Sequence, residues 1–291
     1  MSAIAATSQS SEIQTEAAQL DCELADKYAR VQALLGEMER ALIAYSGGID
    51  STLMAKLALD ELGAERVLAV TANSPSLMPE DFDEAAAQAA YMGLPHEVVE
   101  TSELENPDYA SNPVNRCYFC KSELHDTLRP LAWERGYPYA IDGVNADDLH
   151  DYRPGVQAAK ERGARSPLAE VGITKLEVWQ LSRFLGLPWW DKPAQPCLSS
   201  RFPYGEAITA EKLARVAAGE RYLRNLGWRE VRVRSERDTA RIEIPRDRIG
   251  EFVETVDLDE LVREFQRAGF LYVALDLEGL QSGKLNRAIA L

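Results

Sequence analysis

Apolar residues recur along this chain with two different spacings, and the two spacings alternate from one segment to the next. Short apolar runs, each of which predicts a buried strand, occupy residues 41–48, 66–72, 96–101 and 139–143. Segments with apolar side chains three and four positions apart, each of which predicts a helix, occupy residues 16–40, 51–62, 80–92 and 118–135. Alternating strands and helices are typical of a parallel sheet with helices on both faces. We therefore predict an α/β fold for this part of the chain.

The pattern changes in the last third of the chain. Thr174 and Glu177 form a capping-box pattern, which predicts a helix start. Residues 189–206 contain prolines and have no periodicity, so they predict a loop. After this loop the spacings predict a helix, a hairpin, a second helix and a third strand, at residues 209–226, 229–245, 247–268 and 270–277. We expect a disordered polar tail, an α/β domain and a small α+β domain, at residues 1–18, 19–200 and 201–291.

Charge and composition narrow the class of protein. The 291 residues include 32 Lys and Arg, 47 Asp and Glu and 3 His, so the formal net charge is −15. General binding of nucleic acid is not expected, because phosphate contacts need clustered basic side chains. No apolar run is long enough to predict a membrane span, and the first twenty residues do not resemble a secretory signal. The cytoplasm is the expected compartment.

Four cysteines do not make a disulfide framework in so long a chain, and Cys22 is expected to be a buried small side chain in the first helix.

Two glycines follow the first predicted strand, at the start of the next helix. Gly47 and Gly48 let the backbone approach an anion closely, and the helix offers free N–H groups and the positive end of its dipole. Ser46 and Ser51 add hydroxyl donors. Asp50 alone would repel a phosphate, so its presence predicts a bridging Mg²⁺. The segment is therefore a candidate pyrophosphate site.

The sequence SGGIDS resembles the PP-loop of the ATP pyrophosphatases, whose pattern is SGGxDS. Members of this superfamily have an adenine nucleotide α-hydrolase-like fold, adenylate a carbonyl or carboxylate oxygen, and release pyrophosphate. The resemblance implies that ATP binds to residues 46–51. It also implies that Thr71, at the end of the second strand, contacts the adenosine. Gly143 and Asn145, after the fourth predicted strand, are assigned to the same nucleotide site.

Three cysteines carry a second candidate chemistry. Cys117 and Cys120 form a CxxC pair, and Cys197 lies in the proline-containing loop. A zinc site would need a fourth ligand, for which His125 and His150 are candidates. A dithiol redox pair would need only the CxxC cysteines. A [4Fe–4S] cluster held by three thiolates leaves one iron open for a ligand such as sulfide.

Four further segments, together with the PP-loop, resemble the LarE family of ATP-dependent sulfur transferases, which help to build a nickel-pincer nucleotide cofactor. These segments are NPVNRCYFCKSEL (112–124), GVNADDLHDYRPG (143–155), PCLSSRFPYG (196–205) and LDLEGLQSGKLN (275–286). The resemblance implies adenylation of a carboxylate of pyridinium-3,5-biscarboxylic acid mononucleotide and replacement of its oxygen by sulfur. One subgroup takes the sulfur from the cysteine that corresponds to Cys197, and that subgroup lacks the CxxC cysteines. Because this chain has Cys117, Cys120 and Cys197, we favour the subgroup in which a [4Fe–4S] cluster carries the sulfide.

A phosphorylated, multiply anionic substrate calls for arginines. Arg201 follows the cysteine loop, while Arg232 and Arg234 are two apart on a predicted strand and share one face. Glu243 lies across the hairpin and can orient them. The resemblance implies that corresponding residues surround a phosphate; the alternative is an exposed strand face with surface ion pairs. Lys121, beside the CxxC pair, can stabilise the acyl-adenylate or the leaving AMP.

Other interpretations stay open at this point. Some tRNA thiolation enzymes combine a PP-loop with three cluster cysteines, but the net charge of −15 disfavours an RNA substrate. A non-catalytic ATP-binding or zinc-stabilised module is a further alternative. The resemblance implies a homo-oligomer, trimeric or hexameric, and leaves open other nickel-pincer biosynthesis proteins as partners. The roles of four charged side chains after the fourth strand are undecided between ligand contacts and structural pairing: Asp147, Asp148, Asp151 and Arg153.

Overall fold

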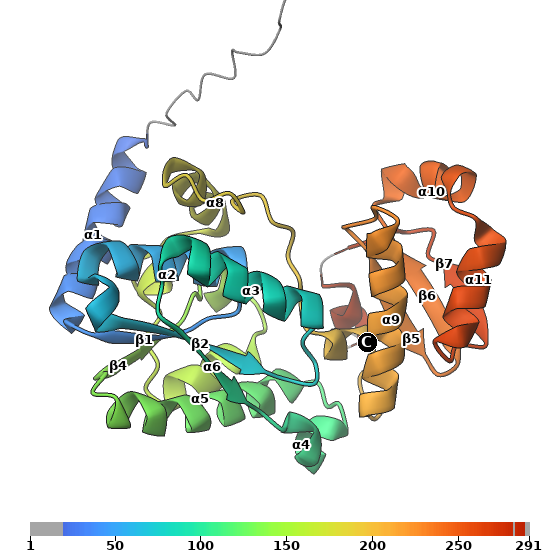
Figure 1. The fold of residues 1–291 in the computed structure, drawn as a ribbon, viewed down its shortest axis with the longest axis horizontal. Coiled ribbons are helices and arrows are strands. Elements are labelled where there is room, and N and C mark those ends of the chain that lie inside the picture. Colours follow the sequence, from blue (N-terminus) through green and yellow to red (C-terminus); the bar gives the residue numbers. More distant parts are fainter. Residues whose placement is uncertain (1–19, 282, 289–291) are drawn as a thin grey trace, which may run out of the picture.

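A computed structural model describes residues 20–281 and 283–288 of the chain, so the tail predicted at residues 1–18 lies outside the described residues. Two sheets are present in the described part, each with its own helices (Figure 1). The larger sheet is built from the first half of the chain and the smaller one from the last quarter. The exact domain boundary at residues 200–201 stays a prediction.

The larger sheet has four strands in the order β3-β2-β1-β4, and every neighbouring pair is parallel. The strands are β1 (Ala41–Ala44), β2 (Val67–Asn73), β3 (His96–Glu100) and β4 (Tyr139–Ile141). Each corresponds to one of the predicted apolar runs, which confirms the parallel α/β fold. Because the strands are parallel, their carboxyl ends meet at one edge of the sheet, where ligand sites of open α/β folds lie.

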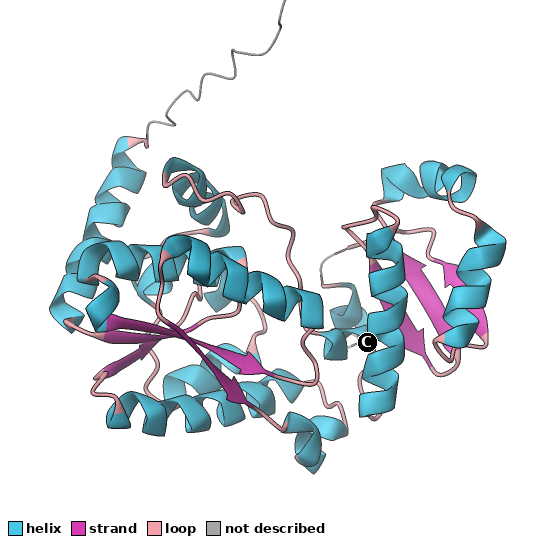
Figure 2. Cartoon of the chain, viewed as in Figure 1, coloured by secondary structure: helices cyan, strands magenta, loops and turns pink. Residues whose placement is uncertain are grey.

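Helices cover both faces of this sheet, as Figure 2 shows. One face is covered by α1 (Cys22–Met38), α2 (Ile49–Leu62) and α3 (Pro79–Met92), with α7 (Pro167–Val171) and α8 (Lys175–Phe184) packed beside them. The other face is covered by α5 (Arg116–Glu134), against which α6 (Pro154–Glu161) packs; the short α4 (Pro107–Ala110) precedes α5. Within the described residues, no helix is both long and apolar enough to cross a membrane.

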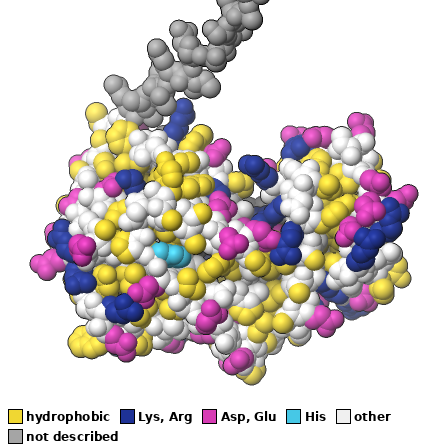
Figure 3. Space-filling view, viewed as in Figure 1, with side chains coloured by type: hydrophobic (Ala, Val, Ile, Leu, Met, Phe, Trp, Pro, Cys, Tyr) yellow, Lys and Arg dark blue, Asp and Glu magenta, His cyan; other side chains and the backbone are white. Residues whose placement is uncertain are grey.

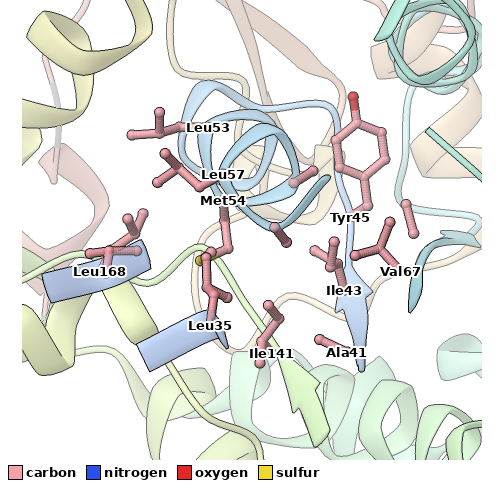
Figure 4. Close-up of a cluster of buried hydrophobic side chains, with 14 of the residues drawn as sticks. Leu35, Ala41, Ile43, Tyr45, Leu53, Met54, Leu57, Val67, Ile141 and Leu168 are labelled. Carbon is pink, nitrogen blue, oxygen red and sulfur yellow. The ribbon is translucent and has the colours of Figure 1, made fainter. Parts of the chain in front are cut away.

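Alternating side chains of the strands divide the core between the two faces. In β1, Ile43 packs with the α1 and α2 side chains, whereas Leu42 packs with Leu128 of α5. Figure 4 shows the first of these clusters, in which Leu53 and Leu57 of α2 lie over the sheet. Strands buried on both faces read as continuous apolar runs, which is why the sequence pattern identified them.

The smaller sheet has three strands in the order β5-β6-β7. The hairpin strands β5 (Arg232–Glu236) and β6 (Thr239–Glu243) are antiparallel, while β7 (Tyr272–Leu275) pairs parallel to β6. Its helices are α9 (Ala210–Asn225), α10 (Ile249–Thr255) and α11 (Leu258–Arg267). The single helix predicted for residues 247–268 is therefore wrong: α10 ends at Thr255, and Asp257 caps the separate helix α11 by accepting from the Glu260 amide.

The two parts of the molecule are joined through an apolar contact. Leu198 and Phe202, from the proline-containing loop, belong to the core of the smaller sheet. So do Met78, which precedes α3, and Tyr109 of α4. Figure 3 shows charged side chains of both signs along the junction on the surface. The loop that carries Cys197 is therefore packed between the two sheets rather than free in solvent.

Cys22 differs from the expectation of a buried residue. It is the first residue of α1, directly after the N-cap Asp21, and its side chain is exposed. The buried stripe of α1 passes through Leu24, Val31 and Leu35. Cys22 lies outside this stripe, so the prediction of a buried side chain is wrong.

The predicted capping box at α8 is confirmed. The Thr174 hydroxyl accepts from the Glu177 amide, and the Glu177 carboxylate accepts from the Thr174 amide at 2.7 Å. Removal of the hydroxyl in Thr174→Ala is expected to lower the free energy of unfolding by about 0.5–2 kcal/mol. Urea unfolding monitored by circular dichroism measures this change. Thr174→Ser, which keeps the acceptor, should recover most of the loss; equal losses in both variants would contradict the capping role.

Candidate functional site

The glycine-containing loop turns sharply from β1 into α2. Gly47 has a left-handed φ of 67°, and a Cβ atom there would lie 2.6 Å from the Cβ of Ala85 in α3. Gly48 is the N-cap of α2 and has no side-chain capping bond. The Ser46 and Ser51 hydroxyls are 3.0 Å apart and brace the loop. Within the described residues, no side chain caps the N-terminus of α2, as an anion site requires.

Asp50 lies at the centre of a polar contact between distant segments. Its carboxylate accepts from the side-chain amide of Asn145 at 3.0 Å and pairs with Lys175 Nζ at 2.6 Å. Gly143 backs directly onto the loop, because a Cβ atom there would lie 2.6 Å from the Ser51 amide nitrogen. The structure therefore brings the predicted residues Asp50, Gly143 and Asn145 to one place, and it adds Lys175 to them.

Thr71, the predicted contact of adenosine, has a buried side chain whose hydroxyl already has partners in the protein. Its side chain is buried, and the hydroxyl lies 2.8 Å both from the Tyr45 carbonyl, to which it donates, and from His96 Nε2. These contacts tie β2 to its neighbouring strands. A contact between Thr71 and adenosine stays a prediction.

A lysine from the proline-containing loop reaches the PP-loop. Lys192 Nζ donates to the Gly47 carbonyl at 3.0 Å and pairs with Glu84 at 3.1 Å. The side chain is only 9% exposed. Lys192 is five positions before Cys197, so this contact anchors the beginning of the cysteine loop at the candidate nucleotide site.

The three cysteines come from two segments that lie against each other. Cys117 and Cys120 are in the first turns of α5, and Cys197 directly precedes a short helical turn. Although Cys117 is exposed, the surrounding protein raises the pKa of its thiol, and so does the charge of Cys197. Burial raises the pKa of Cys120 to about 12, and Cys197 again adds to the shift. Arg116, directly before Cys117, donates to the Ser199 carbonyl, so the loop that carries Cys197 packs against the first turn of α5. A meeting of all three thiols stays a prediction.

The segment from the end of β4 to the first turn of α6 connects the candidate nucleotide site with the CxxC cysteines. It begins at Gly143, against the PP-loop, and ends at Gly155, where a Cβ atom would lie 2.9 Å from Lys121 Cγ and 3.7 Å from Cys117 Cβ. Lys121 therefore packs beside the CxxC pair, as expected. The same segment passes through the four charged residues left undecided by the sequence.

Those four residues have mainly structural partners. Arg153 pairs with Asp148 at 2.8 Å and more loosely with Asp151 at 3.5 Å. Asp148 also accepts from the backbone amide of Asn145, and Asp147 accepts from the backbone amide of Lys175. These contacts hold Asn145 and Lys175, which in turn hold Asp50.

No metal site is found among residues 20–281 and 283–288: no group of three or more His, Cys, Asp or Glu side chains there is arranged to hold a metal ion. His125, a candidate zinc ligand, is buried, and its pKa is lowered to about 4 by burial and by the nearby Lys121. His150 is exposed. A cluster makes a different demand, because its ligands are distributed over several irons.

Arg201 has a different position from the one expected of a substrate ligand. Its side chain is 1% exposed and forms a bidentate pair with the fully buried Glu220 of α9, at 2.7 and 2.9 Å. Its Nη1 donates to the carbonyls of Pro196 and Cys197 at 2.7 and 3.1 Å. Burial alone would raise the pKa of Glu220, but the pairing with Arg201 outweighs it and lowers that pKa. Arg201 thus fixes the backbone of the cysteine loop through these hydrogen bonds.

Arg232 and Arg234 lie at the same junction. Arg234 pairs with Glu243 at 2.8 Å, as predicted, and donates to the Ser200 carbonyl. Arg232 is buried, yet it donates only to the carbonyls of Val231 and Ala194 and forms no ion pair with the described residues. Burial and the neighbouring Arg201 lower the pKa of Arg232 to about 10. A buried cation without a carboxylate is suited to an anionic ligand.

Sequence reasoning missed four side chains that the structure brings into this region: Arg116, Lys175, Lys192 and Glu220. Arg116 donates from α5 to the Ser199 carbonyl, and the other three make the contacts described above. No local spacing identifies them, because each acts on a partner far away in the sequence. The position of Arg116 directly before Cys117 was the one available signal.

Comparisons with known proteins agree with this geometry. The NAD synthase family model matches residues 30–111, which include the PP-loop but not the cysteines. An uncharacterized protein of Synechocystis is 65% identical over 91% of this chain and 99% of its own length. The pyridinium-3,5-bisthiocarboxylic acid mononucleotide synthase of Lactiplantibacillus plantarum is 43% identical over 90% of this chain and 95% of its own length. An NH₃-dependent NAD⁺ synthetase of Methanosarcina acetivorans is 30% identical over 52% of this chain and 60% of its own length.

The buried Arg201–Glu220 pair predicts a large effect on stability. Glu220→Gln leaves the Arg201 charge buried without a counter-ion, so the free energy of unfolding should fall by about 3–5 kcal/mol. Glu251→Gln, which removes an exposed ion pair with Arg248, is the matched control and should leave the free energy of unfolding almost unchanged. Guanidinium unfolding of both variants measures the difference, and similar losses would refute the structural importance of the buried pair.

Proposed function

The chain belongs to the LarE family, and we propose that it is an ATP-dependent sulfur transferase that adenylates a carboxylate of pyridinium-3,5-biscarboxylic acid mononucleotide and converts it to a thiocarboxylate. We further propose that the sulfur is a sulfide held by a [4Fe–4S] cluster. The synthase of Lactiplantibacillus plantarum, similar to this chain along nearly its whole length, is named for the bisthiocarboxylic acid product.

One observation carries this proposal: two separate segments each run from the PP-loop to the cysteines. The first joins Gly143, against Ser51, to Gly155, against Cys117. The second begins where Lys192 docks on Gly47 and continues to Cys197. A carboxylate activated at the PP-loop would thus lie next to the thiols, as sulfur transfer requires.

Activation needs a carboxylate oxygen to attack the α-phosphorus of ATP while pyrophosphate leaves. The N-terminus of α2 and the hydroxyls of Ser46 and Ser51 would hold the leaving pyrophosphate. The Asp50 carboxylate is the donor type that Mg²⁺ prefers, and a bound Mg²⁺ would neutralise charge on the phosphates. Lys175 now balances the charge of Asp50 and would be free to contact phosphate once the cation binds.

Asp50→Asn is expected to abolish release of pyrophosphate, because the amide keeps the contact with Asn145 but cannot hold the cation. A coupled pyrophosphate assay with substrate present measures it. The products of the wild-type protein give the control: AMP and pyrophosphate are expected. Release of ADP and phosphate would contradict cleavage between the α and β phosphates.

The substrate's phosphate is proposed to bind at Arg232 and Arg234, at the junction between the sheets. Arg232 carries the stronger argument, because its buried charge has no carboxylate partner in the described residues, whereas Glu243 already balances Arg234. Arg201, held by Glu220, is reassigned from substrate binding to support of the cysteine loop.

Arg232→Ala removes a charge-assisted contact worth ~1.5–3 kcal/mol, so apparent substrate affinity should fall roughly tenfold to a hundredfold. Arg232→Lys keeps a charge and should lose less, and Arg234→Ala should also weaken binding. Isothermal titration with the substrate and, separately, with ATP distinguishes the sites. An equal loss of ATP affinity would place Arg232 at the nucleotide instead.

The number and type of the cysteines support the cluster proposal. Two of them lie in the first turns of α5, and the third lies in the loop that packs against that helix. Cys117, Cys120 and Cys197 would hold a [4Fe–4S] cluster, which when bound would supply a sulfide at its open iron. The chain's own groups position this site: Arg201 holds the Cys197 carbonyl, and Lys121 stands beside the CxxC pair to stabilise the leaving AMP.

Mass spectrometry after anaerobic turnover tests the sulfur source. We expect several products per chain and an unchanged protein mass. A loss of about 34 Da at Cys197, the mass of H₂S, would mean that the cysteine gives up its own sulfur and would refute the cluster proposal. Alanine at Cys117, Cys120 or Cys197 should remove iron and activity together, while Cys22→Ala, at an exposed thiol of α1, should change neither.

The expected trimer or hexamer also stays a proposal, based on the family resemblance alone. Light scattering coupled to size-exclusion chromatography gives the mass directly.

A further inference from the structure

Lys192 lies in the loop that leads from α8 to Cys197, and its side chain is almost buried. Figure 1 shows this loop crossing from α8 to the smaller sheet. Lys192 Nζ donates to the Gly47 carbonyl at 3.0 Å and pairs with Glu84 of α3 at 3.1 Å. A buried ammonium group loses its hydration, so fixed acceptors must replace the water. Both acceptors belong to the PP-loop or to the helix beside it, so Lys192 has one defined position.

The backbone around Lys192 is held against α3. The Lys192 amide donates to the Trp189 carbonyl at 3.0 Å, which closes a tight turn. The Trp189 ring packs edge-on against Tyr91 of α3, with the ring centroids 5.2 Å apart. Glu84 and Tyr91 are seven residues apart in α3, so they lie on the same face of that helix. The turn therefore contacts one helix face at two places, and the lysine side chain starts from a fixed base.

The hydrogen bond from Lys192 determines how the peptide between Gly47 and Gly48 is oriented. This peptide is trans, so its carbonyl and its N–H point to opposite sides of the chain. Lys192 holds the Gly47 carbonyl on one side, and the Gly48 N–H consequently points to the other. There it donates to Ser46 Oγ at 3.4 Å, on the side of the hydroxyls that are proposed to hold pyrophosphate.

The two glycines give this peptide freedom to turn over. Neither residue has a Cβ atom, and Gly47 has a left-handed φ of 67°. If the peptide turned over, the Gly47 carbonyl oxygen would point toward the anion and repel it, and the site would lose an N–H donor. Among the described residues, Lys192 is the only donor to that carbonyl. The orientation that an anion needs therefore depends on a side chain of the cysteine loop.

We infer that Lys192 is a positioning residue that couples nucleotide binding to the position of the cysteine loop. Lys192 holds the Gly48 N–H toward the phosphates. In return, a phosphate bound to that N–H holds the Gly47 carbonyl toward Lys192 and keeps the loop in place, because coupling between two equilibria is reciprocal. The inference rests on the proposed function only for ATP binding at residues 46–51, and not for the source of the sulfur.

Nucleotide affinity tests the first half of the coupling and needs neither substrate nor cluster. Lys192→Met keeps an unbranched chain of similar size but cannot donate to the Gly47 carbonyl. Isothermal titration with a non-hydrolysable ATP analogue and Mg²⁺ should show an affinity at least about fivefold lower than that of the wild-type protein. Unchanged affinity in the folded variant would overturn the inference.

Lys212→Met is the matched control. Lys212 Nζ makes the same kinds of contact, because it donates to the Ala207 carbonyl at 2.9 Å and pairs with Glu206 at 2.8 Å, but it lies in α9. This variant should keep the wild-type affinity for the analogue. Equal losses in Lys192→Met and Lys212→Met would show a general effect of removing a lysine and would contradict the coupling.

Hydrogen exchange tests the reciprocal half. In the wild-type protein, bound nucleotide should slow the exchange of backbone amides at residues 189–197 by at least about fivefold. In Lys192→Met, at a nucleotide concentration that saturates the variant, the slowing should be largely lost. The amides of α11 are the internal reference and should not change in either protein. Equal protection of residues 189–197 in both proteins would mean that the nucleotide covers the loop directly, which overturns the inference.

The wild-type protein alone decides the question if Lys192→Met does not fold. Slower exchange at residues 189–197 with α11 unchanged supports the coupling, and exchange that nucleotide does not alter overturns it. The same measurements separate this inference from the proposed function. A wild-type chain that does not bind the ATP analogue refutes both, whereas binding without protection of the loop refutes the coupling alone.

Discussion

The buried pair between Arg201 and Glu220 determines where Cys197 stands. Glu220 comes from α9 and also accepts from the Val233 amide of β5 at 3.0 Å, so a single carboxylate joins the smaller sheet to the cysteine loop. The remaining donors of Arg201 hold the carbonyls around Cys197. A buried pair of this kind contributes little net stability compared with an apolar pair, but it specifies one arrangement strongly, because any other leaves a charge without a partner.

From the other side, the same loop is held by the larger sheet. Arg116 and Tyr109 contact Ser199, and the Leu198 amide donates to the Ser76 carbonyl after β2. At its start, Lys192 is attached to the PP-loop. The loop has no regular secondary structure over most of its length, yet both sheets constrain it. This explains how a segment without periodicity can carry a side chain that must be placed accurately for chemistry.

Local sequence patterns predicted the structural features that depend on neighbouring residues, but they did not predict the contacts between distant residues. The strands of the larger sheet, the turn at Gly47 and Gly48 and the capping box at Thr174 each depend on neighbouring residues, so the pattern revealed them. The break at Asp257 had a local signal, an acidic cap with Glu260 three residues later, which the longer helical spacing obscured.

The partners of buried charges had no such signal. The prediction for Arg201 depends on its place after the cysteine loop and on the need of an anionic substrate for arginines, and nothing local indicates that Glu220 on another helix neutralises it. Cys22 was expected to be buried from its residue type, whereas its position at the helix start, outside the apolar stripe, decides its exposure. Lys175 and Lys192 likewise act on residues more than a hundred positions away.

The central claim is that ATP activation and sulfur delivery share one continuous site. A crystal structure of the anaerobically reconstituted protein with a non-hydrolysable ATP analogue tests it most directly. The account predicts a cluster on Cys117, Cys120 and Cys197, with its open iron facing the α-phosphate of a nucleotide bound at residues 46–51. A nucleotide at the PP-loop with the cysteines free of iron, or with their metal facing away from the α-phosphate, would contradict it.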